Sequence, residues 1–342
     1  MTLALTDLRA TVGTFELGPI GLTVGSEVLS VLGPSGSGKT TLLQSIAGIV
    51  TPEAGTVALD GRELTDRPLE ERGVGLVFQD GALFPHMTAH ENVAYAAADD
   101  DRVADLAELL ELDGVLDRRP PDLSGGEAKR VALARTLAAD PDALLLDEPL
   151  ASLDAPIRRR LRSELRDIFA DLDVPVIYVT HDRRAAMALG DRVAIVRDGV
   201  IEQVDDPETV IDRPASRFVA RFTGTDNRLD GTVSGQTDLG AVVRVGDLEL
   251  RTDVQASSGT AVTACVHPSR IELGREADGD ENVFAGRVRR RLYEGDAHRV
   301  AVKLAGVDAT VTVSVRPQSG TVPENGRETA VWIPPDAIHL LD

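Results

Sequence analysis

The chain is poor in cysteine, in aromatic residues and in long apolar runs, and each shortage excludes a class of structure. Cys265 is the only cysteine among 342 residues, so one chain can form neither a disulfide framework nor a multi-cysteine metal site, and we expect a reducing compartment. Aromatic residues make up 3% of the chain, so its cores must be built from aliphatic side chains.

No apolar run approaches the roughly 18 to 20 residues that a membrane-spanning helix needs. The N-terminus also lacks a basic region followed by an apolar run, which is the pattern of a signal peptide. If the protein serves a membrane process, we expect a partner to supply the membrane-spanning part.

Positive charge is scarce, with 36 basic residues against 56 acidic ones and a formal net charge of -20. Because nucleic-acid-binding surfaces are basic, this balance argues against nucleic acid as a partner. Lys39, Lys129 and Lys303 are the only lysines, and arginine supplies the other basic positions. A codon bias explains arginine in place of lysine but not the acidic excess, so we interpret the surface as halophilic.

The pattern of the chain changes near residue 225, which predicts an α/β domain over 1–224 and an all-β domain over 225–342. Short strands broken by glycine are expected from Leu3 to Val31. Continuous apolar runs predict strands buried on both faces, as in a parallel sheet covered by helices, at Val28–Leu32, Ala143–Leu146 and Val176–Val179. Residues 80–140 read mostly as helices and predict an inserted helical subdomain.

The β region repeats itself. Asn227-x-x-x-Gly231-x-Val233 recurs as Asn282-x-x-x-Gly286-x-Val288, and a spaced set of Gly, Val or Ile, Pro, Ile and Leu starting at Gly259 recurs from Gly326. We therefore expect two related β units, at about 227–273 and 282–341.

A glycine-rich loop lies between the first buried strand and a segment of helical composition. The loop and the residue after it are Gly33, Pro34, Ser35, Gly36, Ser37, Gly38, Lys39, Thr40 and Thr41. This fits GxxxxGK[ST], in which backbone N–H groups converge on phosphate oxygens, Lys39 reaches the terminal phosphates and Thr40 can hold Mg²⁺. The strand before it and the helix after it make a simple turn a poor alternative.

Two carboxylates, Asp147 and Glu148, follow the apolar residues Leu144–Leu146. Behind a phosphate-binding loop, Asp147 is expected to hold Mg²⁺ and Glu148 to polarise an attacking water. His181 follows another buried strand, and taken alone it reads as a surface histidine.

The run Leu123–Glu127, which includes Ser124, Gly125, Gly126 and Glu127, resembles the signature motif of ABC ATPases. Gln79 resembles the Q-loop of that family, Ser152-Leu153-Asp154 the D-loop and His181 the switch histidine. The resemblance covers about 1–224 and implies a P-loop NTPase that hydrolyses ATP with Mg²⁺ as cofactor.

The resemblance also implies that two copies dock head to tail. Each ATP would then be bound by Lys39 and Glu148 of one copy and by Ser124 and the following amides of the other, with Asp154 at the nucleotide. Gln79 would contact Mg²⁺ and sense the γ-phosphate region, and His181 would contact the γ-phosphate. The family usually stacks an aromatic residue on adenine where this chain has Val12; Phe15 is the substitute, unless it is a core residue.

The repeated β region resembles the TOBE domains, which are OB-like, of importer ATPases, and Gly81–Thr88 resembles the segment of importer subunits that docks a membrane partner. These resemblances imply an importer ATPase at the cytoplasmic face of the cell membrane, under two permease subunits served by an extracytoplasmic solute-binding protein. The β units are similar to oxyanion-sensing barrels, so molybdate or tungstate is the first expected solute. Iron, sulfate, thiamine, polyamine or sugar import remain alternatives, as do a regulatory sensor and, remotely, a soluble ABC ATPase of DNA repair or translation.

Overall fold

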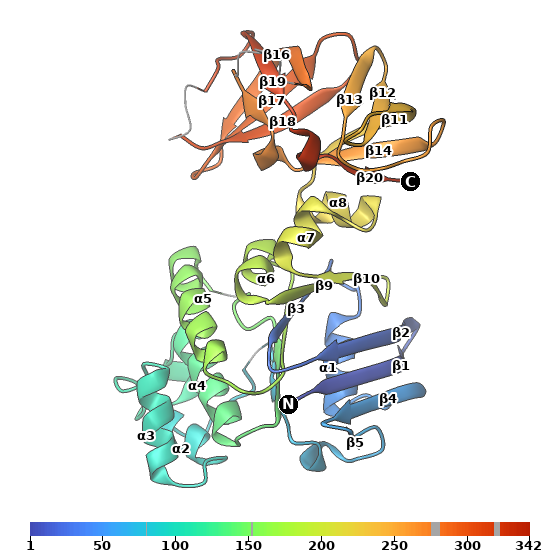
Figure 1. Cartoon of the computed structure of the whole chain (residues 1–342). Coiled ribbons are helices and arrows are strands. Elements are labelled where there is room, and N and C mark those ends of the chain that lie inside the picture. The colour runs from blue at the N-terminus through green and yellow to red at the C-terminus, as the bar shows by residue number, and fades with distance from the viewer. Residues whose placement is uncertain (80, 152, 275–280, 318–321) are drawn as a thin grey trace. The chain divides into compact units, whose positions relative to one another are not determined.

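The computed structural model describes residues 1–342 except 80, 152, 275–280 and 318–321. It divides into two compact units, Met1–Pro207 and Glu208–Asp342 (Figure 1). Among the described residues, no helix has the length and apolar character needed to cross a membrane.

The division falls before residue 225 because two short helices, α7 (Pro207–Asp212) and α8 (Arg217–Thr223), are tied to the β unit. Ala220 of α8 packs against the buried Cys265 and Leu341. Thr225 Oγ1 donates a hydrogen bond to the Ile211 carbonyl at 3.1 Å. This division differs from the boundary expected near 225, because it groups residues 208–224 with the β region.

A six-stranded sheet in the order β10-β9-β3-β8-β7-β6 forms the centre of the first unit. Strands β3, β6, β7, β8 and β9 run parallel, and β10 pairs antiparallel with β9. The three strands predicted to be buried on both faces are β3, β7 and β8, and every residue in them is buried. The bounds are β3 Val28–Leu32, β6 Val74–Val77, β7 Ala143–Asp147, β8 Val176–Thr180, β9 Arg192–Arg197 and β10 Val200–Asp205.

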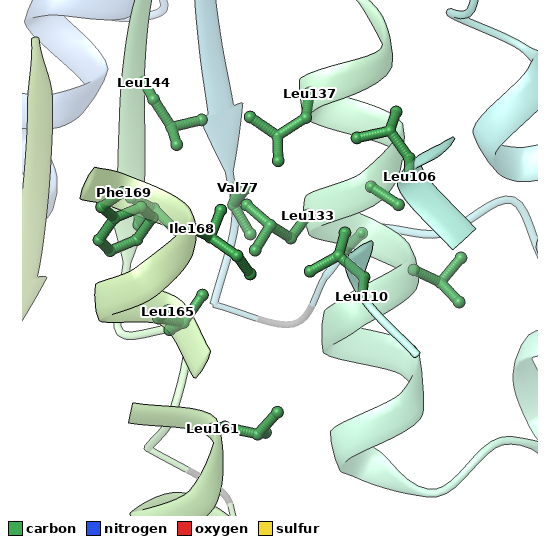
Figure 2. Packing of buried hydrophobic residues seen from close by; sticks show 14 of the residues in the cluster. Val77, Leu106, Leu110, Leu133, Leu137, Leu144, Leu161, Leu165, Ile168 and Phe169 are labelled. Carbon is green, nitrogen blue, oxygen red and sulfur yellow. The ribbon is translucent and has the colours of Figure 1, made fainter. Parts of the chain in front are cut away.

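Helices contribute much of one hydrophobic cluster of this unit, and strands β1, β2 and β4 contribute to another. Figure 2 shows leucines of α3 and α4 and the apolar face of α5 meeting near Val77 of β6. Phe169 is the aromatic side chain labelled there, in agreement with a core built from aliphatic residues. The helices are α1 Lys39–Ala47, α2 Ala89–Ala94, α3 Asp100–Leu109, α4 Gly125–Ala138, α5 Ala155–Ala170 and α6 Arg183–Leu189.

The N-terminal segment forms two long strands, β1 (Leu3–Val12) and β2 (Phe15–Val24), rather than the short strands expected from its glycines. They belong to a sheet ordered β2-β1-β4-β5, with β4 at Ala54–Leu59 and β5 at Arg62–Glu63. Gly18 does not break β2; it permits close approach, because a Cβ there would lie 2.1 Å from the Leu8 carbonyl oxygen.

Besides the two helices, the second unit contains two five-stranded sheets, β13-β12-β11-β14-β20 and β15-β19-β16-β17-β18. The last strand of each sequence repeat pairs with the other repeat: β15 with β19, and β20 with β14. The bounds are β11 Asn227–Gln236, β12 Ala241–Val245, β13 Leu248–Arg251, β14 Ala261–Val266, β15 Glu272–Leu273, β16 Val283–Tyr293, β17 His298–Leu304, β18 Thr310–Val315, β19 Glu328–Trp332 and β20 His339–Leu341.

The two repeats also exchange side-chain contacts. Asn227, at the start of β11, accepts a hydrogen bond from Thr312 N at 2.6 Å and donates to Thr312 O at 2.8 Å. Asn282, just before β16, makes the same pair of bonds with the backbone of Arg251, at 2.8 and 2.7 Å. Each buried amide thus satisfies a backbone position of the opposite repeat.

Candidate functional site

The glycine-rich loop connects β3 to α1, as its sequence context indicates. Gly38 has φ +99°, and a Cβ there would lie 2.8 Å from the Phe15 ring, so the position requires glycine. Lys39 is 6% exposed, and its Nζ donates hydrogen bonds to Gly33 O at 2.9 Å and Pro34 O at 2.8 Å. The ammonium group is therefore held inside the loop.

Burial lowers the pKa of Lys39, while the nearby carboxylates of Glu148 and Asp147 act in the opposite direction. A positive charge held in this loop is suited to bind the terminal phosphates of a nucleotide.

Asp147, the last residue of β7, is buried beside the loop. Burial raises its pKa; a hydrogen bond from Thr40 and the charge of Lys39 act against that rise. Its Oδ1 is buried without a hydrogen-bond partner among the described residues. A buried carboxylate oxygen with spare bonding capacity, next to a hydroxyl, fits the oxygen donor set that Mg²⁺ requires, and Asp147 and Thr40 would hold the ion.

Glu148 and His181 form the shortest polar contact of the site, with 2.5 Å between Glu148 Oε2 and His181 Nδ1. The Glu148 side chain is 15% exposed and that of His181 is 56% exposed. Glu148 has φ +47°, a left-handed conformation that costs a non-glycine residue about 1–2 kcal/mol. Its N–H donates to Val179 O at 3.0 Å, which fixes it to the neighbouring strand.

These residues share a cavity of about 520 Å³. The residues that line it are Val12, Phe15, Ser35, Gly36, Gly38, Lys39, Thr40, Thr41, Gln79, Glu148 and His181. The structure therefore brings the phosphate loop, the Q-loop glutamine and the Glu148–His181 pair together. It places both candidates for the adenine contact there: Val12 is 45% exposed, and the half-buried Phe15 packs against the core as well as the loop.

The signature residues lie elsewhere in the chain, at the start of α4. Ser124 caps this helix: its Oγ accepts from Glu127 N at 3.3 Å, and Glu127 Oε2 accepts from Ser124 N at 2.7 Å. These bonds lower the pKa of Glu127. A second cavity of about 410 Å³ is lined here by Ser124, Gly126, Glu127, Arg130, Pro156, Ile157, Arg160 and Leu161. Within the described residues, no signature residue lines the first cavity.

The D-loop match lies just before α5, which begins after Asp154. The Asp154 side chain makes no capping hydrogen bond. Arg158 connects this segment to the residue after His181, since it donates to Leu153 O at 2.7 Å and lies 3.8 Å from Asp182. Ser152 lies outside the described residues.

The segment Gly81–Thr88 is held by two side chains. Buried Asn92 accepts from Phe84 N at 2.9 Å and donates to three carbonyls of the segment. Arg135 of α4 donates to Ala82 O at 2.9 Å and stacks over the Phe84 ring at 5.1 Å. This contact ties the segment after Gln79 to the signature helix.

One contact of the site was not predicted from the sequence. Lys129 of α4 donates a hydrogen bond from Nζ to the carbonyl of Glu148 at 3.1 Å. The available signal was that it is one of three lysines in a chain whose other basic residues are arginines.

Comparison with known proteins identifies both parts of the chain. Residues 20–151 match the family described as ABC transporter, and residues 264–341 match the TOBE domain family. The chain is 43% identical over 309 residues to the sulfate/thiosulfate import ATP-binding protein CysA 2 of Agrobacterium fabrum, covering 83% of this chain and 89% of that protein. It is 41% identical over 290 residues to the spermidine/putrescine import ATP-binding protein PotA of Thermobifida fusca, covering 81% and 75%.

A solved structure agrees with these relatives. The dimeric, post-hydrolysis state of the ATP-binding cassette MJ0796 bound to ADP and Pi superposes with a TM-score of 0.54 and 29% identity, covering 60% of this chain and 98% of that one. The predicted fold class, a P-loop ATPase followed by a TOBE domain, is confirmed. The chain belongs to the ABC transporter family, as an ATP-binding protein that hydrolyses ATP with Mg²⁺ and carries a TOBE domain.

Proposed function

We propose that two copies of this chain form two composite ATP sites, and that ATP-driven closure and opening of the dimer drives solute import. The observation that carries this proposal is the separation of the two half-sites, because Lys39 and Ser124 line different cavities of one chain. A second copy, docked head to tail, brings a capped helix N-terminus to the open side of the phosphate loop. The dimeric MJ0796 cassette supports this arrangement.

Within each composite site, the residues take the following roles. Glu148 is the general base that polarises the attacking water, and His181, which contacts it at 2.5 Å, holds the carboxylate toward the γ-phosphate. Mg²⁺, when bound, neutralises charge that develops on the phosphates. Gln79 senses the γ-phosphate region and passes its state to the segment that Arg135 ties to α4. Asp154 contacts the nucleotide across the dimer.

We assign the solute to the sulfate and thiosulfate class. None of the relatives named above is an importer of molybdate or tungstate, the first expected solutes, whereas CysA 2 is a sulfate/thiosulfate importer at 43% identity. Sulfate is also a tetrahedral oxyanion. PotA, at 41% identity, makes polyamine import the second candidate. The chain would work at the cytoplasmic face of the membrane with two permease subunits and an extracytoplasmic solute-binding protein.

The solute is tested by complementation. A strain that lacks its own sulfate-import ATPase, supplied with this chain and its permease partners, should take up labelled sulfate. A matched strain that carries Lys39→Ala should not, because its phosphate loop has lost the ammonium. Uptake of labelled spermidine in place of sulfate would support the polyamine candidate and overturn the oxyanion assignment.

We also propose that the acidic surface is an adaptation to high salt. With a net charge of -20, the acidic side chains repel one another at low ionic strength, and salt screens that repulsion. Thermal unfolding in rising KCl should show a higher midpoint at molar concentrations than at 0.1 M. A protein most stable at low salt would overturn this idea.

A further inference from the structure

We propose that Lys129 is a positioning residue, which holds the backbone of Glu148 and thereby links the signature helix of a copy to the base in that same copy's ATP site. This inference rests on the proposed role of Glu148 and on the composite dimer. The hydrogen bond from Lys129 to Glu148 joins the phosphate-loop half-site and the signature half-site of one chain, whose residues otherwise line separate cavities.

The contact is specific in geometry. Lys129 Nζ donates to Glu148 O at 3.1 Å, and Glu148 N donates to Val179 O at 3.0 Å. Both backbone polar groups of Glu148 are therefore engaged, although its φ of +47° is unfavourable for a residue with a side chain. A strained conformation persists only where its surroundings fix it. The N–H of Ala151 also donates to Glu148 O, at 3.2 Å. Lys129 therefore supplies one of three such backbone constraints, and it is the one that comes from α4.

Lys129 lies on the same helix, α4, as the signature residues. Ser124 caps the N-terminus of this helix, and Lys129 lies five residues on, about 7.5 Å further along the axis. A γ-phosphate bound at Ser124 would belong to the ATP held by the other copy's loop. A shift of α4 on that binding would move Lys129, and with it the carbonyl of Glu148, in this copy's own site. Binding of ATP at one composite site would then change the position of Glu148 in the other site.

The choice of side chain fits this role. Of 36 basic residues only three are lysines, and one of the others, Lys39, lies in the phosphate loop. Lysine carries a compact charge on a flexible stem, whereas arginine presents a wide planar fork. Lys129 lines a small cavity of about 20 Å³ together with Val77, Leu146 and Pro149. Its charge also acts on Asp147.

The first test compares Lys129→Met with the wild-type chain. Methionine keeps the length of the stem but loses the donor, so kcat should fall about 10- to 100-fold, the effect of losing a hydrogen bond from a charged group. ATP affinity should stay within about twofold, because the loop is untouched. Lys129→Arg retains the charge and a donor but presents them in a wide planar fork, so it should restore kcat only in part. The matched control is Lys303→Met, which removes a lysine paired with Asp308 in the other unit.

The second test asks through which group Lys129 acts. In a Glu148→Gln background the base is already absent, so adding Lys129→Met should change the residual single-turnover rate less than about twofold. The double variant should still form an ATP-dependent dimer by size exclusion, because Ser124 is intact. The Hill coefficient of Lys129→Met for ATP should fall toward one.

Two results would overturn the proposal. One is a Lys129→Met protein with wild-type kcat and Hill coefficient. The other is an added loss of ATP-dependent dimer in the double variant, which would mean that Lys129 acts through the signature face or the fold. Failure of the proposed function gives different results: normal hydrolysis by Glu148→Gln alone would show that another group is the base, and a Ser124→Arg homodimer with wild-type activity would contradict the composite site.

Discussion

His181 Nδ1 lies 2.5 Å from Glu148 Oε2, and the two residues follow neighbouring parallel strands, β8 and β7. The carboxyl ends of parallel strands meet at one edge of a sheet, so two residues 33 positions apart in sequence form a direct polar contact. The pair opens onto the cavity that contains Lys39 and Gln79.

Replacing Glu148 with glutamine should remove the base and leave the shape of the site nearly unchanged. We expect hydrolysis to fall by about 10²- to 10⁴-fold, the usual contribution of a general base. ATP should then accumulate in a closed dimer. Phosphate release and size-exclusion chromatography with ATP measure the two effects, and normal turnover would show that another group is the base.

Replacing His181 with alanine should uncouple the carboxylate from its partner. The expected loss in kcat is about 10²-fold or more, with ATP affinity retained, because the phosphate loop does not depend on the imidazole. Equilibrium binding of a fluorescent ATP analogue and steady-state hydrolysis separate these effects. A variant that lost ATP affinity and kept kcat would show that His181 serves nucleotide binding rather than the positioning of Glu148.

Replacing Asp147 with asparagine should raise the stability of the nucleotide-free protein and abolish its ATP hydrolysis. Burial raises the pKa of Asp147, so this group stabilises the fold below its unfolded pKa near 3.8, and that contribution is lost as pH rises through the raised folded value. At neutral pH the nucleotide-free variant should therefore melt above wild type, while Mg²⁺-dependent hydrolysis is lost. The difference in melting temperature should shrink toward acidic pH. A variant that melts below wild type at pH 7 would show that the ionised, buried carboxylate of Asp147 does not destabilise the fold.

The equivalence of Asn227 and Asn282 predicts equal effects from two distant substitutions. Replacing either with alanine leaves a backbone N–H and C=O of the opposite repeat without their partner, at about 1–3 kcal/mol for each orphaned group. Urea unfolding of the β unit should shift by similar amounts in the two variants, with ATP hydrolysis unchanged. Ser234→Ala, at an exposed single hydrogen bond, is the control. Losses of unfolding free energy that differ severalfold between the two variants would show that Asn227 and Asn282 are not structurally equivalent.

Much of the ATPase unit followed from the sequence, because its buried strands are continuous apolar runs and its loop carries a spaced motif. Val28–Leu32 and Val176–Thr180 came out as strands with their functional residues at the ends. The N-terminal strands did not, because Gly18 permits a close strand approach there rather than a turn.

The rest depended on contacts between residues far apart in sequence. The exchange of β15 and β20 between repeats cannot be read from spacing, since the periodicity of a strand does not name its partner. The bond from Lys129 to Glu148 depends on how α4 packs beside β7. The division at Pro207 rather than near 225 follows from the packing of α8 on Cys265 and Leu341.

The central claim, that each ATP site is built from two copies, is tested most directly by mixing two inactive variants. Lys39→Ala removes the phosphate-loop ammonium, and Ser124→Arg fills the signature cavity. A dimer with one variant in each copy carries both defects in one composite site and leaves the other site intact. We predict that the mixture hydrolyses ATP well above either homodimer alone. A mixture no more active than the separate variants, or a Ser124→Arg homodimer with wild-type activity, would contradict the composite site.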